Sequence, residues 1–229
     1  MSEPELHARG LKLLDLCCCA GGAGKGYADI GFNVTGVDIL PQPAYPYTFV
    51  QADAVDYVRE HGHEYDLIHT SPPCQTYSVL NAYNHGEYPD LIEAIREAVQ
   101  ATSKPYIIEN VEGARSELQS PVVLCAHSSF DLLMYRHRLF ETSFDVACTL
   151  THYSHDVLCS RNGYLPTPGR PYMTITGGKH SRAWRRKACE VMGTPWMATI
   201  REVCEAIPPA YTSFIGLMYL WSLGLEVVA

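Results

Sequence analysis

The chain has 229 residues, of which 47% are hydrophobic and 18% charged, so it can form the core of one sizeable domain and is not disordered as a whole. No apolar run is long enough to cross a bilayer, and the polar N-terminus lacks a signal-peptide pattern, which predicts a cytoplasmic protein without a membrane partner. Nine cysteines, an odd number, indicate reduced thiols rather than a disulfide framework.

The net charge of −8 argues against a nucleic-acid partner, but the charge is unevenly distributed. Nine Lys or Arg and three Asp or Glu fall between Arg136 and Lys187, so this segment carries +6 and the rest of the chain −14. An acidic body with one basic segment can still present a phosphate-binding face. The alternative is a solvated charged surface that binds nothing.

The first predicted strand, 11–16, runs into a turn of small residues that extends to Gly26. A helix is expected over 23–30, and its N-terminus would point at a ligand that approaches the backbone of this turn. The turn is neither a dinucleotide fingerprint nor a Walker loop, so by itself it is a weak indication of a cofactor.

Two further predicted strands, 34–39 and 48–52, carry Asp38 and Asp53 at their ends. A carboxylate at the end of the second strand can accept hydrogen bonds from ribose hydroxyls. Together with the turn, the two acids predict a nucleoside-binding edge. Asp53 also precedes a predicted helix, 54–60, and could cap it as well.

A fourth predicted strand, 65–70, ends at Ser71-Pro72-Pro73-Cys74 because two prolines cannot continue a ladder. Cys74 is therefore expected on a stiff loop beyond a strand's carboxyl end, where open α/β sheets bind ligands. Its thiol is a candidate nucleophile, and the alternative is a small buried cysteine.

The remaining chain continues the alternation of strands and helices and then loses its pattern. We predict an α/β fold with a doubly wound, mostly parallel sheet, an irregular appendage and C-terminal helices. The further predicted strands are 104–111, 122–125 and 137–141, a loop covers 81–89, the appendage covers 143–182, and the helices are 90–101, 184–192, 199–206 and 208–223.

Cysteines and histidines gather in and just before the appendage: Cys125, His127, Cys148, His152, His155 and Cys159. These residue types form zinc sites, but the segment has no C-x-x-C knuckle. We assign no metal ligands from the sequence.

Taken in order, the motifs resemble those of the DNA cytosine-C5 methyltransferase family, in a compact form like those that bacteriophages encode. Each motif alone is weak, and their order along most of the chain is specific. The matching segments are 15–22 with the acids at 38 and 53, Pro73-Cys74-Gln75, Glu109-Asn110-Val111, Arg136-His137-Arg138, 185–192 and 206–216.

The resemblance implies a Rossmann-like S-adenosylmethionine-dependent methyltransferase fold and transfer of a methyl group to C5 of a cytosine flipped out of double-stranded DNA. We expect a monomer in the cytoplasm of a bacterial cell or a phage-infected host. Restriction-modification is an expected setting, and the sequence leaves open whether the enzyme protects its own genome or modifies that of a host. The expected units are a catalytic and cofactor-binding domain (1–142), a target-recognition region (143–183) and returning helices (184–229).

Within this resemblance, Cys74 adds to C6 of the base, Glu109 acts at N3, Arg138 holds O2 and Arg136 supports it. Asn110 is expected to brace the loop. Asp38 would bind ribose, Ile39 adenine and Asp53 the adenine amino group. The expected cofactor residues are Asp15, Cys17, Cys19, Ala20, Gly21, Gly22, Asp38, Ile39, Asp53, Pro73, Glu205 and Ala206. The expected DNA contacts are Gln75, Ser78, Arg161, Arg170, Lys179, Arg182, Arg185 and Arg186.

Three departures from the family pattern leave the function partly open. Cys17 and Cys19 stand where a glycine is usual, and Glu205 stands where an asparagine is usual. Glu205 and the nearby Lys25 either face solvent or tune the pocket for a modified, more acidic donor. The appendage is short, which predicts a short recognition site or relaxed specificity. The motifs are also compatible with RNA as the substrate, with a non-catalytic DNA-binding decoy and with a thiol or zinc module.

Overall fold

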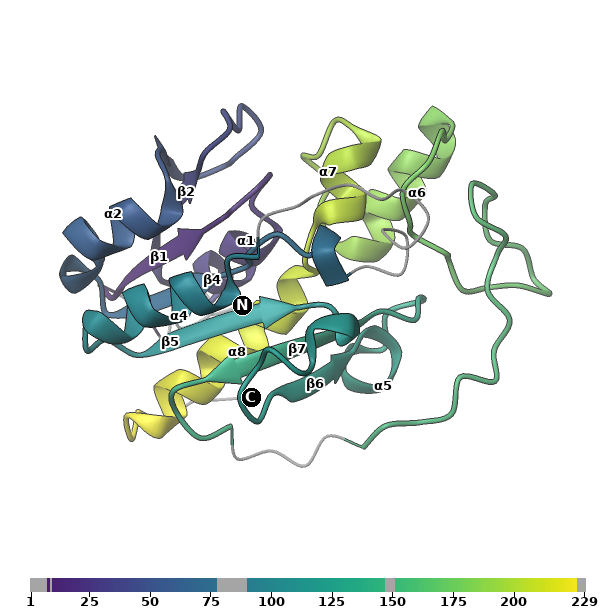
Figure 1. The fold of residues 1–229 in the computed structure, drawn as a ribbon. Coiled ribbons are helices and arrows are strands. Elements are labelled where there is room, and N and C mark those ends of the chain that lie inside the picture. Colours follow the sequence, from purple (N-terminus) through teal and green to yellow (C-terminus); the bar gives the residue numbers. More distant parts are fainter. Residues whose placement is uncertain (1–7, 9, 78–89, 147–150, 226–229) are drawn as a thin grey trace, which may run out of the picture.

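The computed structural model describes residues 8, 10–77, 90–146 and 151–225. They form a seven-stranded sheet in the order β3-β2-β1-β4-β5-β7-β6 (Figure 1). The strands are β1 (Lys12–Leu16), β2 (Asn33–Asp38), β3 (Thr48–Gln51), β4 (Leu67–Thr70), β5 (Tyr106–Asn110), β6 (Val122–Cys125) and β7 (His137–Thr142). Within this sheet β7 is antiparallel to both of its neighbours, and the other pairings are parallel. The predicted mostly parallel sheet is confirmed.

Successive strand residues point to opposite sides of the sheet, and apolar side chains are present on both sides. Helices cover both faces and bury these side chains. Leu13 belongs to a buried cluster with Tyr27 and Tyr211, whereas Leu14 belongs to a second cluster on the α2 and α4 side. The helices are α1 (Gly22–Asp29), α2 (Ala54–His61), α4 (Ile92–Ala101), α5 (Ala126–Phe130), α6 (Arg182–Met192), α7 (Ile200–Glu205) and α8 (Pro209–Ser222). The described residues also form three short 3-10 helices, η1 (Gly62–Glu64), η2 (Gln75–Tyr77) and η3 (Glu112–Ala114).

Glycines in α1 allow the C-terminal helix α8 to pack very closely against it. A Cβ at Gly26 would lie 2.1 Å from both Pro209 O and Thr212 Oγ1, and one at Gly22 would lie 2.4 Å from Ile207 O. Thr212 Oγ1 also donates a hydrogen bond to a main-chain carbonyl of α1, at 2.8 Å. This contact packs α8 against α1, the helix that follows the first strand of the sheet.

The segment 151–181 has little regular structure, as the sequence predicts, and runs outside the sheet in green in Figure 1. Two isolated bridges, Cys159 to Tyr172 and Thr167 to Arg170, are its β contacts among the described residues. The short helix α5 was not predicted, because five residues are too few to show a helical period. Ser78, the loop 81–89 and Cys148 lie outside the described residues.

None of the helices in the described ranges combines the length and the apolar character that a membrane span requires.

Candidate active site

Cys74 lies on the loop after β4, and the segment that follows β5 holds this loop in place. Asn110, only 1% exposed, donates a hydrogen bond from Nδ2 to Pro72 O at 3.0 Å. A Cβ at Gly113 in η3 would lie 2.1 Å from Tyr77 O in η2, so glycine is required for this approach. The loop is therefore a firm support for Cys74, and the bracing role expected for Asn110 is confirmed.

Glu109 and Arg138 form an ion pair beside this loop, with Arg138 Nε 3.0 Å from Glu109 Oε1. Glu109 is the next-to-last residue of β5, whereas Arg138 is the second residue of β7. Because β7 runs antiparallel to β5, its first residues lie at the edge where the parallel strands end. The reversed strand is what brings an arginine from the start of one element to a carboxylate at the end of another.

The charges of this cluster act on one another. Burial raises the pKa of Glu109, against the opposing effects of Arg138, a hydrogen bond from Ser71, and Arg136. Burial, and then the Glu109 charge, raise the pKa of Cys74, against the opposing effects of Arg138 and Arg136. Cys74 is therefore a thiol in the free protein at neutral pH, and Glu109 retains a proton more readily than an ordinary carboxyl.

A buried chain of hydrogen bonds leads from α1 to Glu109 through His69 on β4. Tyr27 Oη lies 3.0 Å from His69 Nδ1, and His69 Nε2 lies 2.9 Å from Ser71 Oγ. Burial lowers the pKa of His69 to about 3, so the ring is neutral and carries one N–H. With Tyr27 donating to Nδ1, Nε2–H donates to Ser71 and Ser71 donates to Glu109, so both ring nitrogens of His69 have a partner.

This hydrogen-bond chain was not predicted from the sequence. A histidine inside an apolar strand, two residues before Ser71, is the signal that could have indicated it.

Arg136 uses its donors on main-chain carbonyls. Its Nη2 donates to Cys204 O at 2.8 Å and to Ala206 O at 3.0 Å, and its Nη1 donates to Ile175 O at 3.3 Å. Burial lowers the pKa of Arg136 to about 9, which leaves it charged at neutral pH. Arg136, predicted among the catalytic residues, is therefore a positioning residue that ties the start of β7 to the C-terminal segment.

The carboxyl ends of β2 and β3 offer acceptors and an apolar surface for a nucleoside. The Asp38 oxygens accept hydrogen bonds from Cys19 N–H at 3.0 Å and from a second main-chain N–H at 2.9 Å, so each keeps one lone pair. Ile39 is 64% exposed. Asp53 caps α2 through Oδ1, which accepts from two main-chain N–H groups, and Oδ2 takes no part in the cap. Oδ2 is therefore the oxygen that could accept from the adenine amino group, the second role expected for Asp53.

The turn after β1 places Cys17 and Cys19 in the left-handed region, with φ of 55° and 44°, and Gly21 at 84°. This region costs a non-glycine residue roughly 1–2 kcal/mol. The two cysteines thus occupy the positions where glycine would be unstrained, which is where the chain departs from the family pattern. Burial raises the pKa of Cys17 to about 12, so its thiol stays neutral.

Protein atoms fill the space around the small residues of this turn. A Cβ at Gly21 would lie 2.8 Å from Pro46 Cδ, Gly22 faces the Ile207 backbone, and Trp196 Nε1 donates to Ala20 O at 2.9 Å. We expected these glycines to let a ligand approach the backbone. Close packing within the protein already requires glycine at positions 21 and 22, so a ligand is not needed to explain them.

Asp15, predicted as a cofactor residue, lies beneath the turn with no exposed surface. It accepts a hydrogen bond from Tyr45 Oη at 3.0 Å, and burial raises its pKa to about 8. A direct cofactor contact by its side chain does not fit this burial. Asp15 instead supports the turn from below.

Lys25 and Glu205 each have a partner of their own. Lys25 pairs with Asp29 one turn along α1, and Glu205 pairs with Arg201 at 2.9 Å. These separate ion pairs give no support to a joint role of the two residues in the pocket. Pro73 is half-buried beside Cys74.

The predicted DNA contacts divide into exposed and internal groups. Arg182 and Arg186 lie one turn apart on α6 and share an exposed face. Arg185 is half-buried and donates to Met197 O, so it holds the loop after α6 and is not a free surface cation. Gln75 begins η2, next to Cys74. The other exposed members are Arg161, Arg170 and Lys179.

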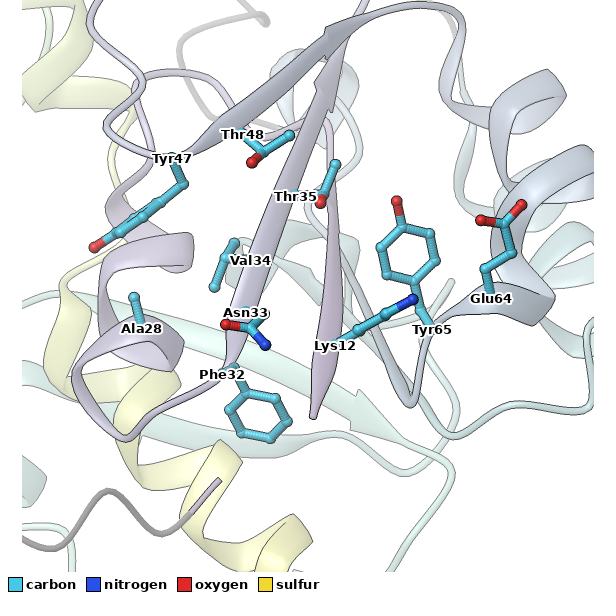
Figure 2. A pocket seen from close by; sticks show the side chains of 10 residues that line it. All are labelled: Lys12, Ala28, Phe32, Asn33, Val34, Thr35, Tyr47, Thr48, Glu64 and Tyr65. Carbon is cyan, nitrogen blue, oxygen red and sulfur yellow. The ribbon is translucent and has the colours of Figure 1, made fainter. Parts of the chain in front are cut away.

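A hollow of about 500 Å³ lies at the opposite edge of the sheet (Figure 2). Lys12, Asn33 and Thr48, which line it, begin β1, β2 and β3. Ligands of open α/β sheets bind outside the carboxyl ends of the strands. The hollow is therefore separate from the cluster around Cys74.

Neither the protein-family models nor the curated proteins gave a match to this sequence. Among solved structures, the Dnmt2 methyltransferase of S. pombe is similar with a TM-score of 0.58 at 12% identity, over 93% of this chain and 98% of that one. A SAM-dependent methyltransferase from Agrobacterium tumefaciens aligns with a TM-score of 0.34 at 19% identity, over 58% of this chain and 55% of that one, just over half its length. The magnesium protoporphyrin IX methyltransferase ChlM of Synechocystis PCC 6803 aligns with a TM-score of 0.37 at 15% identity, over 58% and 70% of the two chains.

The similarity to Dnmt2 extends over nearly the whole of both chains. The protein therefore has the Rossmann-like fold of the S-adenosylmethionine-dependent methyltransferases.

Proposed function

We propose that this protein is an S-adenosylmethionine-dependent DNA (cytosine-5-)-methyltransferase. The observation that carries the proposal is the Cys74 thiol on a braced loop, close enough to the paired Glu109 and Arg138 for both charges to change its pKa. A protein that only bound DNA would need none of these three residues.

The residue types suit the difficulty of the reaction, because C5 of cytosine is too weak a nucleophile to take a methyl group unaided. The Cys74 thiol loses its proton to solvent, its sulfur forms a bond to C6, and the electron pair of the C5–C6 double bond moves to C5. Glu109, with its raised pKa, holds a proton against N3 and offsets the charge that builds up on the ring. Arg138 holds O2. After C5 has been methylated, loss of its proton to solvent restores the double bond and expels Cys74 as a thiolate.

S-adenosylmethionine, when bound, supplies a methyl group that its sulfonium makes electrophilic. The residues present fit this group. Asp38 keeps lone pairs for ribose hydroxyls, the exposed Ile39 offers an apolar surface to adenine, and Asp53 keeps Oδ2 for an exocyclic amino group.

Residues 143–183 are the proposed target-recognition region for double-stranded DNA, acting in a monomer. A base must leave the stack to reach Cys74, and the exposed arginines can hold the flanking phosphates. The same segment exposes large apolar side chains that can contact bases or fill the stack: Tyr153, Val157, Leu158, Tyr164 and Leu165.

The test is transfer of isotope-labelled methyl groups from S-adenosylmethionine to DNA and to RNA, followed by nucleoside mass analysis. We expect 5-methylcytosine in DNA. Cys74→Ser should abolish it, whereas Cys159→Ser, which changes a half-buried cysteine of the appendage, should not. If the labelled methyl group appears in RNA alone, the substrate is RNA and not DNA. A larger mass increment in preparations from cells would indicate a modified donor, and folded protein without any transfer would contradict the proposal.

A further inference from the structure

Four side chains with metal-binding atoms converge at the end of the sheet: Cys125, His137, His152 and His155. Cys125 ends β6 and His137 begins β7, and the two are direct partners in the antiparallel register. Directly opposite residues project their side chains on the same face. His152 and His155 reach this face from the appendage.

The spacing of the four ligand atoms fits one tetrahedral ion. They all lie within 4.8 Å of one another, with Cys125 Sγ 3.4 Å from His155 Nε2 and His137 Nε2 2.9 Å from His152 Nε2. Metal bonds of about 2.0–2.1 Å to nitrogen and about 2.3 Å to sulfur would separate tetrahedral ligands by about 3.3–3.6 Å. Small side-chain movements therefore suffice to accommodate an ion.

Neighbouring groups orient two of the imidazoles for binding. His137 Nδ1 lies 3.0 Å from Glu112 Oε2, so Nδ1–H donates to the carboxylate and the Nε2 lone pair faces the cluster. A carboxylate behind a metal-bound histidine is the usual arrangement of the outer shell. The His155 ring stacks on Tyr135, with centroids 3.9 Å apart and planes at 12°.

We propose that Cys125, His137, His152 and His155 bind a structural zinc ion that fastens the appendage to the sheet. One thiolate and three imidazoles suit zinc, and four protein ligands close its coordination, which is typical of structural sites. Binding displaces the thiol proton of Cys125 to solvent. The ion would lie on the face of β7 opposite to the side chain of the next residue, Arg138, and would fasten the appendage to the strand that carries Arg138.

No ligand set could be assigned from the sequence, because two of the four residues meet through strand register rather than through a short motif. The proposal does not depend on the proposed methyl transfer, since it concerns the attachment of a segment.

The test is the metal content of protein made without a metal-affinity tag, because such a column can load foreign ions. We expect stoichiometric zinc in the wild type and in the control His63→Ala, which changes an exposed histidine of η1, and none in the double variant His152→Ala/His155→Ala. Both removed ligands are exposed, so circular dichroism should show an unchanged fold. Glu112→Gln should weaken zinc affinity about 10- to 100-fold.

Cobalt substitution gives a second readout. The cobalt-loaded protein should show thiolate-to-metal charge-transfer absorption that Cys125→Ser removes. Protein that remains metal-free after reconstitution with zinc, or zinc that persists in the double variant, would overturn the proposal. A different stoichiometric ion on the same ligands would overturn the assignment to zinc.

Discussion

Replacing Asn110 with alanine should destabilise the protein and impair Cys74 together. The Asn110 side chain donates to Pro72 O at 3.0 Å and accepts from Val111 N–H at 2.9 Å. Pro72 is buried, so its carbonyl would lose its partner without gaining water, at a cost of about 1–3 kcal/mol. Val111 is half-buried and would recover part of its loss from solvent. The total is therefore about 1–4 kcal/mol.

Urea unfolding gives the stability change, and the rate of methyl transfer gives the effect on Cys74. Asn110→Asp is the matched control, because it keeps the acceptor for Val111 N–H but sets a carboxylate oxygen against Pro72 O. It should be at least as damaging as alanine at neutral pH. A free energy of unfolding within about 0.5 kcal/mol of wild type for Asn110→Ala, with unchanged transfer, would refute the role assigned to this side chain.

Three further predictions concern the turn and the buried chain of hydrogen bonds. The pKa of Asp15 is about 8 in the folded protein and 3.8 for an ordinary aspartate, so between these pH values the folded state holds a proton that the unfolded state has lost. The free energy of unfolding should therefore fall as the pH rises through this range, by up to about 1.4 kcal/mol per pH unit. Asp15→Asn should flatten this dependence in urea titrations, and an unchanged slope would count against a protonated Asp15. Ser71→Ala removes a hydrogen bond that favours ionised Glu109, so infrared difference spectra should show the Glu109 carboxyl band persisting to higher pH. If the titration of this band does not change, Ser71 does not donate a hydrogen bond to Glu109. Cys19→Gly should remove the backbone strain of a non-glycine residue in the left-handed region and raise the free energy of unfolding by about 1 kcal/mol, whereas Cys19→Val should lower it. If thermal melts rank the two variants in the opposite order, position 19 is not strained.

The parallel strands and their ends could be predicted from the sequence, because their signals are local. Apolar runs bounded by glycine, proline or acids locate β1 to β5, and the residues just beyond them are those that a parallel sheet gathers at one edge. Cys74 and Glu109 were found in this way. The bracing role of Asn110, expected from the family resemblance, agrees with its hydrogen bond to Pro72 O.

What could not be predicted depends on pairing and packing between distant segments. Nothing local in 137–142 says that this strand is reversed, yet the reversal is what brings Arg138 to Glu109 and His137 to Cys125. Gly22 and Gly26 fit a ligand loop in sequence, but in the structure they admit the close approach of α8 and of the residues just before it. His69 gains its role from Tyr27, which lies on a helix far away in the chain.

The central claim, attack of Cys74 on C6 of cytosine, is tested most directly by trapping. Purified protein is incubated with S-adenosylmethionine and double-stranded DNA that contains 5-fluorocytosine. Fluorine at C5 cannot leave as a proton does, so the C6–S bond should persist. We predict a denaturation-resistant complex whose DNA-linked peptide contains Cys74 and which Cys74→Ala does not form. Folded protein that gives no complex on any DNA, or a complex through another cysteine, would contradict the mechanism.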